Sequence, residues 1–262
     1  MLERELFFMK NLIKDFRIAI ELAKVSLKTE VEGTYLGIFW YLLDPILFFL
    51  MIIFVRSFIK GADFGEYPLY LITGLIVFHY FINSTTKMIS FAKSSNTFAE
   101  KSDLSYNCLF MGKFFKSVYL HLFEILVLIL FGLFLGGSII GIALYVLIVL
   151  FFFSLLNAGI SFIISVIGAY FQDFSKIWHL MTRLLRFVMP VFFIFSENSL
   201  LYQINLFNPL FYFLQITRDL IVYAKMPEPF FIIMALAFSI IIFSTGYFLF
   251  NKYNKYFPEL AE

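Results

Sequence analysis

The stretch from residue 125 to residue 172 contains no charged side chain, and this feature restricts the chain to a membrane fold. A helix of about 20 apolar residues crosses a hydrocarbon core of about 30 Å. The charge-free stretch is therefore too long for a single crossing, and Gly136, Gly137 and Ser138 supply a turn near its start. We expect two crossings in this part of the chain, at 118–135 and 139–171.

The composition also indicates a polytopic membrane protein. Of the 262 residues 61% are hydrophobic and 15% are charged, and the mean hydropathy is +0.90. The formal net charge of +2 is too small to suggest a nucleic-acid partner. One membrane domain is therefore expected, with no role in binding nucleic acid.

Four further apolar segments complete an expected set of six crossings. The first segment carries Asp44 and Pro45 near its middle. Proline removes a backbone donor and clashes with the preceding turn, so a kink or break is expected there. Six crossings put both termini on one side of the membrane. The four segments are 34–55, 67–86, 177–195 and 230–250.

Residues 1–33 are expected to form an amphipathic interface helix ahead of the domain at 34–262. Apolar residues from Leu6 to Leu27 recur at helical spacing, and a basic face alternates with them. Such a helix lies in the plane of a membrane interface, and the alternative is a cytosolic helix packed on a partner. Most Lys and Arg residues fall on the side of the termini, which predicts that both termini are cytoplasmic.

Two connections are longer than a turn requires. The inner connection, 87–116, mixes lysines with apolar side chains, and loops of that length usually have a task. The outer connection, 196–229, is unusually apolar, but the part after Pro209 is too short to cross a membrane. We expect it to be re-entrant or to lie on the outer surface, as short helices that turn at Asn208 and Pro209.

Four motifs are distributed over nearly the whole chain. They are EGTYLGIFWYLLDPIL (32–47), YPLYLITGLIVFHYF (67–81), YFQDF (170–174) and NLFNPLFYFLQITRDLIVY (205–223). In sequence and in order they resemble the motifs of type-2 ABC exporter permeases of the polysaccharide and polyol-phosphate export family, which exports O-antigen, capsule and teichoic acid.

The resemblance implies an all-α integral membrane protein that pairs with a second copy of itself in the prokaryotic cytoplasmic membrane. Each copy would rest on a nucleotide-binding ABC ATPase subunit and carry a polyprenyl-linked glycan. The chain has no phosphate-binding motif G-x-x-x-x-G-K-[ST], so ATP and Mg²⁺ are expected on the partner, and no enzyme activity is expected here. The alternatives are an exporter of lipid or drug, a membrane enzyme acting on lipid-linked sugars, and a secondary carrier.

Asp44 is the sharpest candidate residue, because an ionisable group near the middle of a membrane usually belongs to a pathway or gate. The structural alternative is that Asp44 caps a half-helix that starts at Pro45. Aromatic rings that stack on the flat C–H faces of sugars are candidates for the channel wall. The candidate channel residues are Asp44 with Tyr35, Trp40, Tyr41, Phe48, Phe187, Phe192 and Phe195.

Two other groups are candidates for coupling and gating. The ATPase should contact the inner connection, and the outer connection could form a gate, although Arg218 and Asp219 could instead simply be solvated. His121 and Glu124 share a helix face, as a relay or as a simple pair, while His79 and His179 are given no chemistry and no metal site is expected. The coupling candidates are Ser94, Asn96, Phe98, Glu100, Leu104 and Asn107, and the gate candidates are Asn208, Pro209, Arg218 and Asp219.

Overall fold

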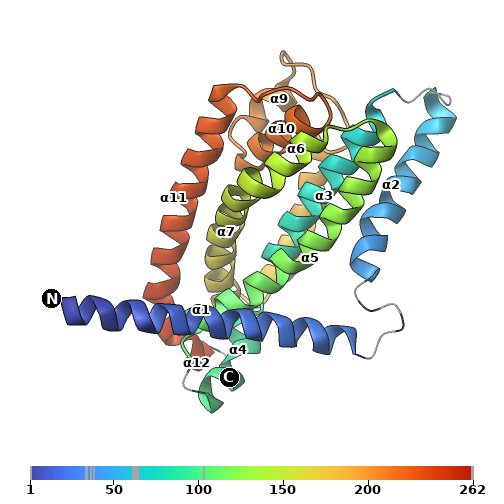
Figure 1. The fold of residues 1–262 in the computed structure, drawn as a ribbon. Coiled ribbons are helices and arrows are strands. Elements are labelled where there is room, and N and C mark those ends of the chain that lie inside the picture. Colours follow the sequence, from blue (N-terminus) through green and yellow to red (C-terminus); the bar gives the residue numbers. More distant parts are fainter. Residues whose placement is uncertain are drawn as a thin grey trace.

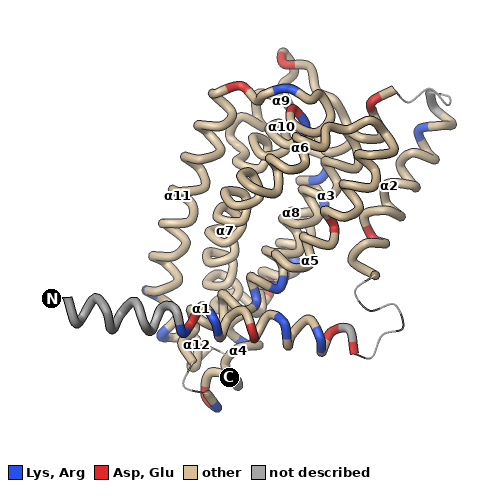
Figure 2. The backbone as a smooth tube through the Cα atoms, in the orientation of Figure 1, with Lys and Arg blue, Asp and Glu red and all other residues tan. Residues whose placement is uncertain are grey.

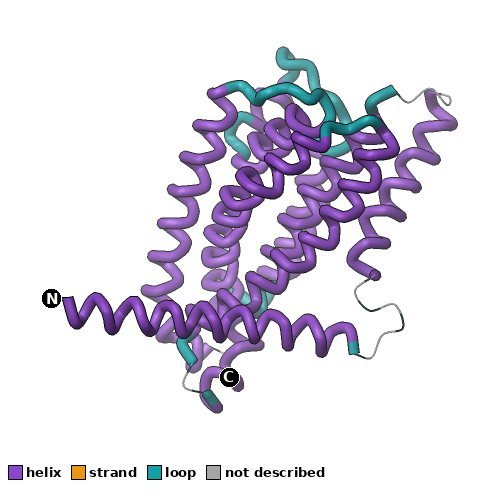
Figure 3. The backbone as a smooth tube through the Cα atoms, in the orientation of Figure 1, coloured by secondary structure: helices purple, strands orange, loops and turns teal. Residues whose placement is uncertain are grey.

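The computed structural model describes residues 2–32, 35, 37, 39–60, 65–102 and 104–260. All regular structure in these residues is helical (Figure 3). Within them, five helices are long and apolar enough to cross a membrane. The chain is therefore an all-α integral membrane protein. The five are α2 (Phe39–Lys60), α3 (Tyr67–Thr86), α5 (Tyr106–Leu135), a continuous helical unit at Ile139–Tyr170, and α11 (Pro229–Tyr253).

Helix α1 (Leu2–Val31) lies across one end of the bundle, at a steep angle to the other helices (Figure 1). It packs on α5, where Ala19 and Ala23 are fully buried and Phe16 meets Phe115 edge to face at 5.2 Å between ring centroids. Basic and acidic positions are interspersed along the coloured part of α1 (Figure 2), and Arg17, Glu21 and Lys24 are exposed. This arrangement suits the interface helix that the sequence predicts.

Helix α3 is central and α2 is peripheral. In α3, 78% of the most apolar window is buried inside the bundle, whereas the corresponding share of α2 is 11% (Figure 1). The unit made of α6 (Ile139–Leu144), the π-helical turn η1 (Tyr145–Val149) and α7 (Leu150–Tyr170) packs against both α3 and α11. Most of the surface of α2 is thus left to lipid or to another chain.

Helices α7 and α11 approach closely through two glycines. A Cβ atom added at Gly246 of α11 would overlap the carbonyl oxygen of Gly159 of α7, and one added at Gly159 would overlap the backbone of Phe243. Small residues let membrane helices approach closely enough for continuous van der Waals contact. These two glycines therefore set the distance between the two helices.

A crossing is expected at 177–195, but the helix found there, α8 (Phe174–Val188), begins earlier, ends earlier and is shorter. Its 15 residues extend about 22 Å at 1.5 Å per residue, so α8 is not among the five membrane-length helices of the described chain. The helix stops because Pro190 disfavours the helical conformation at Met189, whose ψ is 152°. Beyond this point the chain turns and buries Met189 and Val191.

Helix α2 corrects two expectations about Asp44 and Pro45. The helix runs without a break from Phe39 to Lys60 with Pro45 inside it, so the break is absent. Asp44 lies within the helix and not at its start, so the interpretation of Asp44 as the cap of a half-helix is wrong. Residues 34, 36 and 38 of the expected span, 34–55, lie outside the described residues.

Short helices occupy both long connections. Near α1, the inner connection contains α4 (Phe91–Lys101) and the first turns of α5, and the chain ends nearby with η2 (Asn254–Tyr256) and α12 (Phe257–Leu260). At the opposite end, the outer connection contains α9 (Leu200–Asn205) and α10 (Pro209–Ile221). Asn208 caps α10, because its side chain accepts a hydrogen bond of 3.1 Å from the backbone N–H of Leu210.

Candidate functional site

A chain of polar side chains crosses the bundle from α3 to η1. His79 Nδ1 lies 2.5 Å from Oε1 of Glu124, and the second carboxylate oxygen of Glu124 lies 2.7 Å from Nδ1 of His121. The other ring nitrogen of His121 lies 2.7 Å from the hydroxyl of Tyr145. Glu124 and His121 are each only 1% exposed, so the polar contacts of the carboxylate are with these side chains and not with water.

Tyr80 fixes the orientation of this chain. Its ring stacks on the imidazole of His121 with 4.1 Å between centroids, and its hydroxyl lies 2.7 Å from Oγ of Ser154 on α7. His121 is therefore held on its face as well as at both ring nitrogens. A side-chain network that is satisfied in this way rigidifies a core.

Asp44 extends the chain to the peripheral helix α2. Its Oδ2 lies 3.0 Å from Nε2 of His79, and its side chain is 74% exposed. A second contact between α2 and α3 is made by Arg56, whose guanidinium lies 3.6 Å from the centroid of the Tyr67 ring. The pair of Asp44 and His79 connects the peripheral helix α2 with the buried polar network.

A second polar contact joins α2 to the end of the bundle near α1. The hydroxyl of Tyr41 donates a hydrogen bond of 2.5 Å to Glu30, and Lys87 donates one of 2.8 Å to that hydroxyl. Lys116 pairs with the same carboxylate. Burial raises the pKa of Glu30, but hydrogen bonds from Lys116 and Tyr41 outweigh it and hold the pKa below the ordinary value. Glu30, near the end of α1, thus contacts side chains of α2 and α5 and Lys87, the residue that follows α3.

The candidate aromatic residues divide into two groups. Phe48 of α2 stacks on Phe192 with 5.7 Å between ring centroids, Phe187 lies 5.5 Å from Phe192, and the guanidinium of Arg186 lies 4.9 Å from the Phe48 ring. The structure therefore brings the α2 and α8 candidates together. Tyr35 and Trp40 are exposed and separate from this cluster, and Phe195 lines a cavity at the end opposite α1.

Arg218 and Asp219 are both 1% exposed, so the expectation that they are simply solvated is wrong. The guanidinium of Arg218 lies 3.5 Å from the Tyr70 ring centroid and donates a hydrogen bond of 3.2 Å to the carbonyl of Val191. Gly74 of α3 leaves room for it, since an added Cβ would collide with the guanidinium. Arg218 thereby ties α10, which begins after Asn208 at Pro209, to α3 and to the segment after α8.

The candidate coupling residues lie on α4 and at the start of α5. Five of the six make contacts within the chain. Asn96 donates to Glu100 at 2.8 Å and accepts from Tyr106 at 2.8 Å, and Asn107 donates to Asn251 at 2.8 Å. Ser94 accepts a hydrogen bond from Lys113, and Leu104 packs against an apolar cluster around Phe91. Phe98 is 48% exposed, so it is the candidate best placed to contact another protein.

Sequence reasoning missed His79, Arg186 and Tyr145. The acidic partners of His79 lie on other helices, and the partner on its own helix is the uncharged Asn83. The one signal that could have suggested it was the pair His121 and Glu124 on one helix face, because a buried carboxylate needs more than one partner. Although two histidines and two carboxylates meet here, no group in the described residues is arranged to hold a metal ion.

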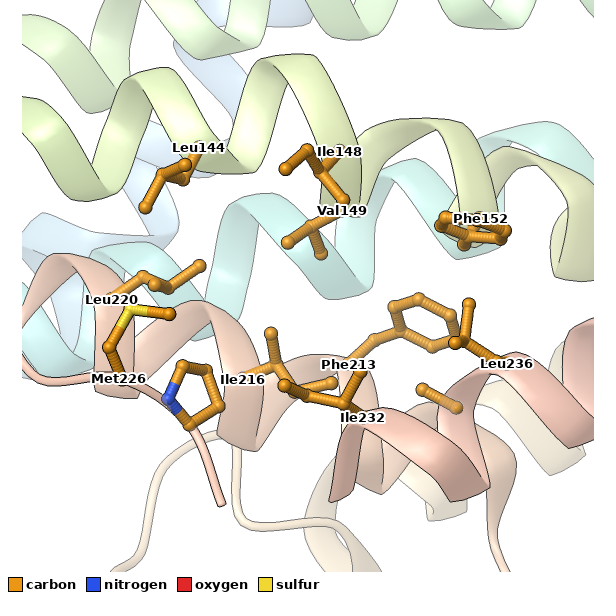
Figure 4. A pocket seen from close by; sticks show the side chains of 12 residues that line it. Leu144, Ile148, Val149, Phe152, Phe213, Ile216, Leu220, Met226, Ile232 and Leu236 are labelled. Atoms are coloured by element: carbon orange, nitrogen blue, oxygen red, sulfur yellow. The ribbon is translucent and has the colours of Figure 1, made fainter. Parts of the chain in front are cut away.

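A separate cavity of about 180 Å³ is lined entirely by apolar side chains (Figure 4). Leu144, Ile148 and Phe152 form one wall along α6, η1 and α7, and Phe213 and Ile232 from α10 and α11 face them. Because the walls offer no side-chain hydrogen-bonding group, the cavity is suited to hydrocarbon and not to a sugar.

Comparison with known proteins gives one informative relative. The chain is 23% identical over 252 residues to the O-antigen export system permease protein RfbA of Klebsiella pneumoniae, and the match covers 94% of this chain and 95% of the relative. No family model matches the chain.

The alignment covers 94% of this chain and 95% of the relative, so it includes most of the membrane helices and most of both long connections. The apolar, membrane-length helices of this chain are what a membrane permease such as that relative would need. Taken together, the similarity and the helices support a type-2 ABC exporter permease.

Proposed function

We propose that this chain is the permease subunit of an ATP-driven exporter that moves a lipid-linked polysaccharide across the cytoplasmic membrane. Two copies would form the pathway, each with one nucleotide-binding ABC ATPase subunit that carries ATP and Mg²⁺. The substrate would be a polyprenyl-linked glycan of the O-antigen, capsule or teichoic-acid type.

The observation that carries this proposal is the similarity to an O-antigen export permease over almost the full length of both chains. An alignment confined to the apolar helices would support little more than a membrane location. Here it covers 94% of the chain, which is more than the membrane helices alone, and so it also takes in connecting segments. The similarity is thus not confined to the spans.

The structure supports a role for α2 and α8 as walls of the pathway. The cluster of Phe48, Phe187 and Phe192 joins these helices, and it offers aromatic faces on which sugar rings can stack. Helix α2 has little buried apolar surface, and it contacts the rest of the bundle through polar groups at Tyr41 and Asp44 and through the aromatic ring of Phe48. In the proposed cycle, α2 shifts relative to α3 when the partner ATPase binds nucleotide.

The end of the bundle near α1 would face the ATPase. The exposed Phe98 on α4 provides an apolar contact there, and α4 packs on α5, α7 and α12. The Glu30 cluster then links α1 and α5 to α2. This gives contiguous packed elements from the proposed ATPase contact to the pathway, as mechanical coupling requires.

The proposal is tested by deleting the gene in its host and measuring surface glycan by immunoblotting of intact cells. Loss of surface glycan with intracellular accumulation of lipid-linked glycan is expected, with recovery when the gene is restored. Recovery should fail when the partner ATPase lacks its phosphate-binding lysine. Normal surface glycan in the deletion strain would contradict the proposal.

A further inference from the structure

The end of the bundle opposite α1 contains a cavity of about 450 Å³, within the range of about 300–1,000 Å³ typical of small-molecule sites. Its walls come from the start of α3, the segment after α8, α9, α10 and the start of α11 (Figure 1). None of its lining residues belongs to the polar chain at His79. It is therefore a second site, separate from the contacts that hold α2.

The lining combines aromatic faces with hydrogen-bonding groups. Tyr70, Tyr202 and Tyr223 line the cavity together with Gln215 and Asp219. Aromatic rings offer apolar faces, while an amide and a carboxylate offer donors and acceptors for hydroxyl groups. A sugar presents both surfaces at once, with flat C–H faces and a rim of hydroxyls.

Asp219 is the best-placed acceptor in this cavity. Its side chain is buried, and its Oδ1 accepts from Gln215 at 3.3 Å and lies 3.3 Å from the ammonium of Lys225. Among the described residues, both of these side-chain contacts go to Oδ1. The second oxygen of this buried carboxylate, Oδ2, therefore keeps its capacity to accept from a ligand hydroxyl.

The charges of the cavity select between classes of ligand. Glu197, Asp219 and Glu228 contribute three carboxylates to the lining, against the ammonium of Lys225. Even with the nearby guanidinium of Arg218, which lies 3.5 Å from the ring centroid of Tyr70, the acidic groups still outnumber the basic ones. This balance opposes the binding of phosphate or an acidic sugar and favours an uncharged or cationic ligand. The apolar cavity of Figure 4, by comparison, has no group that could orient a hydroxyl.

We propose that this cavity binds one uncharged or amino sugar unit of the exported glycan. The proposal rests on the proposed function, which makes a glycan the cargo, and it adds a binding subsite within each single subunit. A sugar held between α3, α9, α10 and α11 would contact the outer segment after leaving the pathway lined by α2 and α8.

The test is saturation-transfer NMR on the complete exporter, permease with its ATPase, in lipid nanodiscs. The probes are D-glucose, D-galactose, L-rhamnose and D-glucosamine, with glucose 1-phosphate as the anionic comparison. At least one of the first four is expected to receive saturation from the protein, and glucose 1-phosphate is not. Tyr223→Ala and Gln215→Ala should each weaken binding about tenfold, which corresponds to about 1.4 kcal/mol.

Two matched variants control for unspecific effects. Tyr256→Ala removes a tyrosine of the same exposure as Tyr223, 39%, at the other end of the molecule. Gln203→Ala removes an exposed amide of α9 that does not line the cavity. Both should bind sugar as the unchanged protein does.

The proposal is overturned if none of the four sugars binds, if glucose 1-phosphate binds equally well, or if Tyr223→Ala and Gln215→Ala bind like the controls. The outcome of this test and the outcome of the gene-deletion test are independent, so a failure of the cavity proposal can be told from a failure of the proposed function. If no sugar binds while cells still export glycan through this chain, only the cavity proposal fails. If sugar binds but deletion leaves surface glycan intact, the proposed function fails.

Discussion

His79 and Asp44 form an ion pair, with Nε2 of the imidazole 3.0 Å from Oδ2 of the carboxylate. The pair joins α2, whose most apolar window is only 11% buried, to a histidine that also contacts the buried Glu124. A change in the position of α2 therefore changes the partners of a buried charge. This makes the pair the natural place for coupling between the pathway wall and the core.

Removing the pair should impair export. Asp44→Asn and His79→Gln are each expected to lower export at least about fivefold, and the double variant should be no worse than the more severe single variant. Asp44→Leu should be more harmful than Asp44→Asn, because leucine keeps no hydrogen-bonding group. The measurement is surface glycan per permease molecule in complemented deletion cells.

The control for Asp44 is Glu21→Gln. Glu21 is comparably exposed, at 68% of its side chain against 74%, and its ion pair is with Lys24 on the same helix. Export by this variant should be unchanged. Full activity of both Asp44→Asn and Asp44→Leu would remove Asp44 from the mechanism.

Glu124 should be the most sensitive buried charge of the core. Glu124→Ala leaves His79 and His121 without their shared carboxylate, and breaking a buried pair on one side costs about 3–5 kcal/mol. The melting temperature of the detergent-purified protein should fall markedly. Glu21→Ala, which removes an exposed carboxylate paired with Lys24, should leave it unchanged. Equal melting temperatures of the two variants would show that the bridge does not contribute to stability.

Gly246 should tolerate no side chain. Gly246→Ala places a methyl group against the carbonyl of Gly159, so α7 and α11 must separate, at a cost of about 1–3 kcal/mol. Thermal unfolding of the purified variant measures this loss. Ser244→Ala, at an exposed position of the same helix, is the comparison and should unfold like the unchanged protein. An unaltered Gly246→Ala protein would show that these helices pack elsewhere.

Phe98 should couple the permease to its ATPase. Phe98→Ser removes an exposed apolar side chain from α4, so ATP hydrolysis should continue while export is lost, and the permease should remain folded. Phe134→Ser removes another exposed phenylalanine, at the end of α5 that lies away from α4, and the variant protein should export normally. The assay compares ATP turnover with glycan export in the same vesicles, and normal export by Phe98→Ser would place the contact elsewhere.

Much of the helical fold could be predicted, because hydrophobic runs and turn residues are local signals. The turns at Gly136 and at Asn208 are both predicted from the sequence, and a helix ends or begins at each of them in the structure. Pro45 misled the prediction, because a proline within a helix removes only one backbone hydrogen bond and the helix can continue. The end of α8 was placed too late, although Pro190 marked it.

The candidate site was less predictable, because its contacts connect distant residues. His121 and Glu124 could be paired from their spacing, but nothing local indicates that His79 completes the bridge. The burial of Arg218 and Asp219 could not be predicted from the sequence either, since adjacent charged residues in a connecting segment are usually exposed. The surroundings of Arg218 are formed by Tyr70 and Gly74, which lie on α3, far away in the sequence.

The most direct test of the exporter function uses purified permease and ATPase reconstituted with a fluorescent polyprenyl-linked glycan in vesicles. The measurement is the amount of glycan that becomes accessible to a membrane-impermeant lectin on the far side of the bilayer. We expect transfer only when permease, ATPase and ATP are all present. Equal transfer by the permease alone, or transfer that does not depend on ATP, would contradict the proposed function.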